Sequence, residues 1–118
     1  SEKTYKAIKM GMPFINFTSK PGILKHLRRL GFKTFHPIID ETYDYPTIQQ
    51  HTENEDQLEE EYFIRFRKLL KELNRLCRMN KDELCDLWKQ CQPIVQHNLT
   101  ILRSLEPEHV RPFPIIEK

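Results

Sequence analysis

The second half of the chain carries apolar residues at steps of three and four, the spacing that places side chains on one face of an α-helix. A first stretch begins near residue 58 and continues for about 20 residues; its apolar positions are Tyr62, Phe63, Phe66, Leu69, Leu70, Leu73, Leu76 and Cys77. A second stretch has apolar positions at Leu84, Leu87, Trp88, Cys91, Ile94, Val95 and Leu102. We expect two antiparallel helices, a helical hairpin over residues 58–105, with Leu73 buried in the centre of the first stripe.

Local signals mark where these helices begin, bend and end. Asn80 is followed three residues later by Glu83, the spacing of a capping box, so a helix should start there. Pro93 lies inside the second stripe and predicts a bend, because proline lacks the backbone N–H that the helix needs. Glu106-Pro107 should end the helix, leaving residues 106–118 as an extended tail.

Shorter units fill the first part of the chain. Helices are predicted near residues 2–10 and 21–30, stopped by Gly11 and Gly31, and strands near 12–17 and 33–35. This alternation predicts a helix-rich α/β fold in which residues 1–45 are the end of a nucleotide-binding, Rossmann-like domain with a parallel sheet. Residues 46–57 form a polar loop between this part and the hairpin.

Size and charge narrow the classes of partner. The chain has 118 residues, enough for one core, and its 19 basic and 17 acidic residues leave a net charge of only +2. Lysine and arginine form no long run, so nucleic acid is not an expected partner. The apolar runs are far shorter than the roughly 20 residues that cross a bilayer, so no membrane span is expected.

The three cysteines are Cys77, Cys85 and Cys91. Their spacing fits neither the close pairs of zinc sites nor an even disulfide framework. Free, partly buried thiols are therefore expected, which favours a reducing compartment such as the cytoplasm. The histidines are scattered without a ligand spacing, so no metal site is predicted.

Glu2 and Lys3 are the candidate binding residues. They follow Ser1, a good N-cap, and so fall in the first turn of a helix, where free N–H groups attract anions. Lys3 would hold a diphosphate and Glu2 would accept hydrogen bonds from ribose hydroxyls. In the alternative, Glu2 only favours the helix dipole and Lys3 is solvated.

An acidic cluster contains Asp40, Glu41 and Asp44. Such a cluster suggests a cation site or a general base, but loop solvation or helix capping is the more common use of these side chains. Cys91 has no neighbouring base at helical spacing, so it is not a candidate nucleophile. The catalytic residues, if the protein has any, stay unknown.

Three segments together resemble a known family. They are Ser1-Glu2-Lys3 leading to Gly11-Met12-Pro13-Phe14, then Pro21 to Phe35 with its Gly31-Phe32-Lys33-Thr34-Phe35 ending, and Ile39 to Asp44. They resemble the C-terminal portion of fucosyltransferase-like glycosyltransferases, enzymes with two Rossmann domains (GT-B), in the form found in phage, algal-virus and bacterial proteins. The resemblance covers residues 1 to about 45 and the helical tail.

The resemblance implies a C-terminal part of a glycosyltransferase, inactive alone, that binds a nucleotide-sugar donor at Glu2 and Lys3. The donor is the substrate, so no separate cofactor is implied. The acceptor would be a glycan or a protein, the missing N-terminal domain and the catalytic base would lie outside this chain, and the protein would act in the host or bacterial cytosol. The alternative is a non-catalytic, α-rich structural or protein-interaction module.

Overall fold

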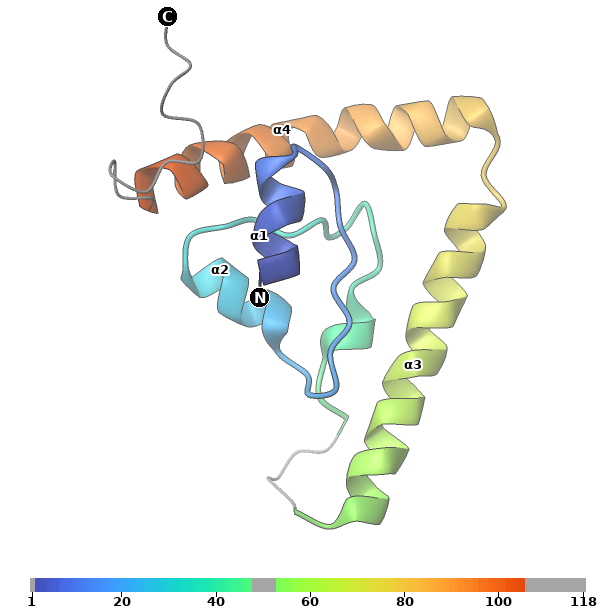
Figure 1. Ribbon diagram of the computed structural model, residues 1–118. Coiled ribbons are helices and arrows are strands. Elements are labelled where there is room, and N and C mark those ends of the chain that lie inside the picture. Colours follow the sequence, from blue (N-terminus) through green and yellow to red (C-terminus); the bar gives the residue numbers. More distant parts are fainter. Residues whose placement is uncertain (1, 48–52, 106–118) are drawn as a thin grey trace, which may run out of the picture.

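Two long helices spread apart like the arms of a V, and the N-terminal part of the chain lies between them (Figure 1). The computed structural model describes residues 2–47 and 53–105. Its elements are α1 (Glu2–Lys9), α2 (Ile23–Arg29), the short 3-10 helix η1 (Thr42–Asp44), α3 (Glu55–Cys77) and α4 (Lys81–Leu105). Residues 48–52 of the predicted polar loop and the whole predicted tail, residues 106–118, lie outside the described residues, and residues 55–57 of that predicted loop belong to α3.

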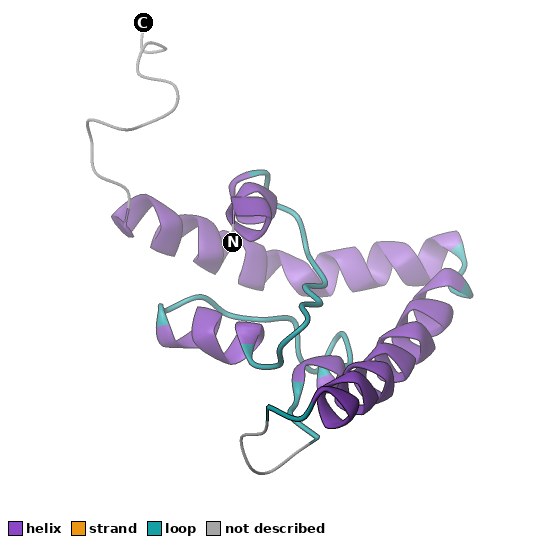
Figure 2. Ribbon diagram, turned by 60° about the horizontal axis from the view of Figure 1, so that its bottom comes forward, coloured by secondary structure: helices purple, strands orange, loops and turns teal. Residues whose placement is uncertain are grey.

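The predicted Rossmann-like α/β fold class is wrong, because the described residues contain helices and loops and no strand (Figure 2). The backbone N–H and C=O groups of a strand need hydrogen-bond partners on a neighbouring strand. In the segments that we predicted as strands, side chains supply these hydrogen bonds instead. The side-chain amide of Asn98 accepts from the Lys33 N–H at 2.7 Å and donates to the Lys33 carbonyl at 2.9 Å. The Phe35 N–H donates to Glu41, and the Asn16 N–H donates to the Tyr43 hydroxyl.

The predicted ends of the two short helices agree with the structure better than the predicted strands do. Gly11 and Gly31 adopt positive φ values of 68° and 103°, the left-handed conformation that ends a helix at little cost for glycine. The start of α2 is capped from a distance, because the Asp44 carboxylate accepts from the N–H groups of Gly22 and Leu24 at 3.1 and 2.9 Å. η1 and α2 are thereby joined.

The core lies where the N-terminal part fills the V. One buried cluster joins α1, α2 and η1 to both arms; its members are Ile8, Leu24, Leu27, Phe32, Tyr43, Leu69 and Leu102. A second cluster lies against the middle of α4; its members are Phe35, Ile39, Cys91 and Val95. Each arm is therefore held by the N-terminal part of the chain.

Arg65 fixes α3 to this N-terminal part. Its side chain is fully buried, and its guanidinium donates to the carbonyls of Tyr43, Thr18 and Ser19 at 2.8, 2.9 and 3.2 Å. Asp44 lies 3.9 Å away and supplies the opposite charge. Burial lowers the pKa of Arg65, and the charge of Asp44 opposes that shift.

Glu72 makes a second attachment, about two turns further along α3. Its buried carboxylate accepts from the Asp40 N–H at 2.7 Å and from Arg75 at 2.7 and 2.6 Å. Arg75 also donates to the Ile38 carbonyl at 3.1 Å. α3 is thus tied by ionic groups as well as by apolar side chains to the loop that precedes η1.

The predicted hairpin is open. The capping box at the start of α4 is confirmed, since the Asn80 N–H donates to Glu83 at 3.0 Å and the Glu83 N–H donates to Asn80 at 2.8 Å. α4 continues through Pro93 as one helix. The predicted burial of Leu73 is wrong, since 37% of its surface is exposed.

Candidate functional site

The face of α4 that packs against the N-terminal part of the chain is covered by it over one part of the helix and uncovered over the rest. Cys91, Val95, Asn98 and Leu102 recur at steps of three and four and are buried beneath the N-terminal part of the chain. Leu84 and Trp88 continue the same spacing toward the apex of the V, yet 45% and 46% of their surfaces are exposed. We call Leu84 and Trp88 the α4 face.

The covering ends because α1 reaches only the second half of α4. At the end of α1, Gly11 comes so close to α4 that a Cβ there would lie 3.7 Å from Val95 and 3.9 Å from Leu99. No element of the described residues approaches the first turns of α4 in the same way (Figure 1). The uncovered length of α4 is therefore a consequence of the open hairpin.

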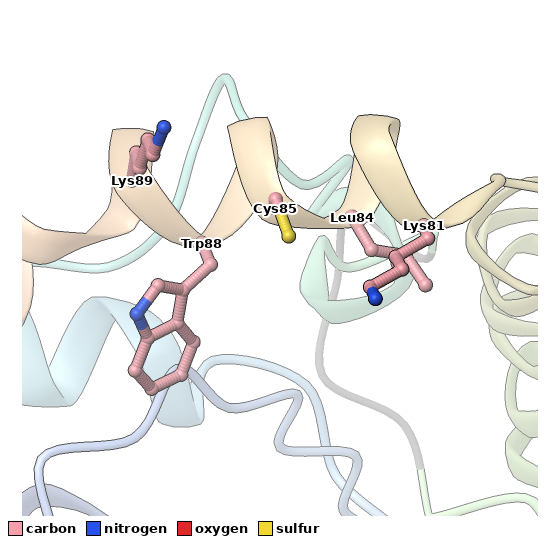
Figure 3. Close-up of a pocket in the computed structure, with 5 residues that line it drawn as sticks. All are labelled: Lys81, Leu84, Cys85, Trp88 and Lys89. Carbon is pink, nitrogen blue, oxygen red and sulfur yellow. The ribbon is translucent and has the colours of Figure 1, made fainter.

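Figure 3 shows the side chains at this place. They border an open hollow of about 460 Å³; its lining residues are Lys81, Leu84, Cys85, Trp88 and Lys89. The Trp88 ring and the Leu84 side chain leave the helix on the same side, and Lys81 lies beside Leu84. Lys89 points to the opposite side of the helix.

This arrangement suits binding rather than catalysis. Cys85 is exposed and has neither a histidine nor a carboxylate among the residues that line the hollow. Apolar carbon dominates the lining, and the charge at its edge is positive. Such a surface favours an apolar ligand that carries negative charge at its margin.

The predicted donor-binding residues are not part of this hollow. Lys3 is exposed in the first turn of α1, and the helix begins at Glu2, whose side chain lies outside the described part of the structure. The first turn of α1 is at the end of the helix farther from α4 (Figure 1). A nucleotide site at Glu2 and Lys3 stays a prediction.

The acidic cluster serves the backbone, as the capping interpretation predicted. Asp40 accepts from the Thr42 N–H at 2.9 Å and from its hydroxyl at 2.7 Å, and these hydrogen bonds hold the pKa of Asp40 below its ordinary value. Glu41 accepts from the Phe35 N–H at 2.7 Å. Asp44 caps α2, so the three carboxylates do not converge on one site.

A second open hollow, of about 480 Å³, carries positive charge; its lining residues are Arg28, Phe32, Lys33, Thr34, His36, Tyr45 and Ile94. Arg28 lies 3.6 Å from Glu41 Oε1, a buried atom without a hydrogen-bond partner. Arg28 also donates to Thr34 at 2.8 Å. These contacts use part of the positive charge within the protein, so the hollow is a weaker candidate than the α4 face.

Comparison of the chain with known protein families, with curated proteins and with solved structures finds no match. In the described ranges, no group of three or more histidine, cysteine, aspartate or glutamate side chains is placed to hold a metal ion. None of the described helices combines the length and apolarity needed to cross a membrane. The geometry is thus the basis for the function proposed below.

Sequence reasoning identified the residues of the α4 face but placed them in the core. The stripe from Leu84 to Leu102 is continuous in the sequence, and its period does not tell which turns are covered. One available signal was composition, because the first turns of α4 contain Lys81, Asp82, Glu83, Asp86 and Lys89 and the covered turns contain no charged residue until Arg103. Arg65 was missed because an arginine in an amphipathic helix usually belongs to the solvated face.

Proposed function

We propose that the chain is a helical protein-interaction module that binds a partner on the α4 face. The observation that carries this proposal is the change from buried to exposed along one continuous face of α4. A leucine and a tryptophan exposed side by side form the kind of apolar anchor on which protein interfaces are centred.

The positive charge at the edge of the hollow indicates which chemical type of partner would bind there. Lys81 lies beside Leu84, and the residues that line the hollow include no acidic side chain. An amphipathic helix with leucine side chains on one face and glutamates beside them would meet both the apolar surface and the positive charge. We therefore propose an acidic amphipathic helix as the partner of the α4 face.

Trp88 is the only tryptophan of the chain, so its fluorescence reports on this surface alone. A synthetic acidic amphipathic peptide should shift the Trp88 emission to shorter wavelength in a saturable titration. Lys81→Glu should weaken that binding by roughly tenfold, the effect of an unfavourable charge at an interface edge. Lys25→Glu, on the exposed side of α2, is the matched control. A peptide that causes no shift, or that binds both variants equally, would contradict the proposal.

A second candidate function is the binding of a nucleotide-sugar donor as part of a fucosyltransferase-like glycosyltransferase. It is favoured by the three segments that resemble this family and by the exposed position of Lys3 in the first turn of α1. The residues that the structure describes do not form the α/β fold that the resemblance implied, so this candidate depends on the motif and on the helix terminus.

Calorimetry with nucleoside diphosphates tests the second candidate on the full chain. Lys3→Ala should weaken binding by roughly 1.5 to 3 kcal/mol, the usual value of a hydrogen bond to a charged group. Glu2→Ala should weaken it less, and only for nucleotides with both ribose hydroxyls. Lys6→Ala, one turn further along the helix, serves as the control. Equal affinities for the Lys3 variant and the unmodified chain would exclude this site.

A further inference from the structure

The N-terminal part of the chain carries a positive charge that has no acidic counterpart beside it in the sequence. Residues 3–39 contain eight lysine and arginine residues and no aspartate or glutamate, which leaves 11 basic and 17 acidic residues for the rest of the chain. All eight basic residues are exposed. The small net charge of the protein is therefore the sum of two regions of opposite sign, and the positive region is accessible to an anionic partner.

The open hollow of about 480 Å³ gathers part of this charge at one place. Arg28, Lys33, His36 and Tyr45 are among its lining residues, which include no acidic side chain. We call these four residues the Arg28 hollow. Lys33 is positioned by its backbone, because the side chain of Asn98 bonds both its N–H and its carbonyl. The sequence did not indicate this surface, since the fold brings together residues up to 17 positions apart that form no basic run.

Arg28 is held at the edge of the hollow with most of its donors unused. Its Nη1 donates to the buried Thr34 hydroxyl at 2.8 Å and lies 3.6 Å from Glu41. Within the described residues the guanidinium makes no other hydrogen bond, and 44% of the side chain is exposed. An arginine that is fixed on one edge and open on the other suits a phosphate group, because its planar donors can bind two phosphate oxygens at once.

The positive surface continues from the hollow along α2. At about 100° per residue, Lys25, Arg28 and Arg29 lie within a sector of about 100° of this helix, and the buried Leu24 and Leu27 lie outside that sector. Neither Lys25 nor Arg29 makes an ion pair in the part of the chain that the structure describes. Cations that extend beyond one hollow favour a chain of phosphates over a single anion.

Tyr45 adds an aromatic ring to this positive surface. Tyr5, Tyr43 and Tyr62 each lie against another aromatic ring. Tyr45 makes no such ring contact among residues 2–47 and 53–105, and 45% of its surface is exposed. An exposed ring beside cations is the combination by which proteins hold single-stranded nucleic acids, whose bases stack on the ring while the cations contact the phosphates.

We infer that the Arg28 hollow and the adjoining side of α2 bind single-stranded nucleic acid. Arg28 and Lys33 contact phosphates in the hollow, Lys25 and Arg29 contact phosphates along α2, and a base stacks on Tyr45. A single strand fits better than a duplex, because the bases of a duplex are paired and stacked on one another and cannot reach the ring. This inference goes beyond the proposed function, because it uses residues outside the α4 face.

Fluorescence anisotropy of a short, labelled oligothymidylate tests the phosphate contacts on the full chain. Lys33→Ala should raise the dissociation constant by roughly fivefold at low salt and reduce the slope of its logarithm against that of the salt concentration by about 0.7, the contribution of one phosphate contact in a single strand. Lys68→Ala is the matched control, because Lys68 is exposed on α3 and does not line the hollow. It should leave both values unchanged.

Tyr45 tests the stacking contact with the same probe. Tyr45→Ala should raise the dissociation constant by roughly tenfold, whereas Tyr45→Phe keeps the ring and should bind as the unmodified chain does. A hairpin duplex of the same nucleotide content should bind more weakly than the single strand and should not respond to Tyr45→Ala. Circular dichroism verifies that all variants keep their helices.

Three outcomes would overturn this inference. They are the absence of saturable binding at low salt, equal effects of the Lys33 and Lys68 variants, and binding of the duplex as tight as that of the single strand with no effect of Tyr45→Ala. The last of these would show only a general attraction of cations for a polyanion. None of them would affect peptide binding at the α4 face, which Trp88 fluorescence measures independently.

Discussion

Arg65 fixes the position of α3, although the sequence of α3 indicates only an amphipathic helix. Its guanidinium satisfies three backbone carbonyls in a part of the chain that has no strand to receive them. The cost of burying a charge is offset only because those acceptors and Asp44 are already in place. Arg65 is thus more important for the position of α3 than most of its apolar neighbours.

Replacing Arg65 should therefore be strongly destabilising. We expect Arg65→Met to lower the free energy of unfolding by about 3 to 5 kcal/mol, because Asp44 and three carbonyls would stay buried without their donor. Arg67→Met, at an exposed position two residues further on, should change it by less than about 0.5 kcal/mol. Urea denaturation of both variants measures the difference. Similar losses would show that Arg65 is not buried as described.

Glu72 gives the stability a pH dependence with a definite sign. Burial alone would raise the pKa of Glu72, but hydrogen bonds from Arg75 and from the Asp40 N–H outweigh it and hold the pKa below the ordinary value of 4.5. A carboxyl with a lowered pKa in the folded state stabilises the protein above its unfolded pKa. That contribution is lost as the pH falls below 4.5 and through the lower folded value.

Glu72→Gln should accordingly be less stable than the unmodified protein at neutral pH, by about 1 to 3 kcal/mol. Its free energy of unfolding should also fall less steeply between about pH 5 and pH 3. Denaturant titrations over that pH range test this, with the exposed Glu59→Gln as a control. Parallel pH profiles for Glu72→Gln and the unmodified chain would contradict the assignment.

At the scale of the elements, the sequence predicted helices better than it predicted what covers them. Gly11, Gly31 and the Asn80 capping box gave correct helix ends because these signals act within one turn. The stripes of α3 and α4 gave helices but not their partners, because a period of 3.6 shows which side is apolar and not what lies against it. The burial of Leu73 was wrong for this reason.

The two leucines Leu69 and Leu73 show which side of α3 is covered. Leu69 is 7% exposed and packs in the core, so Leu69→Ala should lower the free energy of unfolding by about 2 to 5 kcal/mol. Leu73 is half-exposed, so Leu73→Ala should lower it by less than about 1 kcal/mol. Chemical denaturation measures both values. If Leu73→Ala were as costly as Leu69→Ala, α3 would have a covered face at Leu73.

At the scale of the whole molecule, the fold class was the largest error of sequence reasoning. Residues 12–17 are mostly apolar and follow Gly11, and residues 33–35 lie between Gly31 and Pro37, which is typical of short strands, but a strand also requires a neighbour elsewhere in the chain. The side chains of Asn98 and Glu41 supply the hydrogen bonds instead, and no local pattern predicts that Asn98 of α4 will bond the backbone of Lys33, 65 residues earlier. The donor site at Glu2 and Lys3 stays a prediction from the motif.

The open V links the fold to the proposed function. Because the N-terminal part of the chain holds the two arms apart, the first turns of α4 keep an apolar surface that a closed hairpin would bury. The same opening leaves Leu84 and Trp88 beside Lys81, and this arrangement is the basis of the proposed acidic partner. The central claim is therefore that the α4 face is uncovered in the free chain.

Acrylamide quenching of Trp88 fluorescence in dilute solution tests that claim most directly, since no other tryptophan contributes. The open arrangement predicts emission at long wavelength and quenching nearly as efficient as in the chain unfolded by urea. A closed hairpin would give emission at short wavelength and strong protection from acrylamide, and that result would contradict the account.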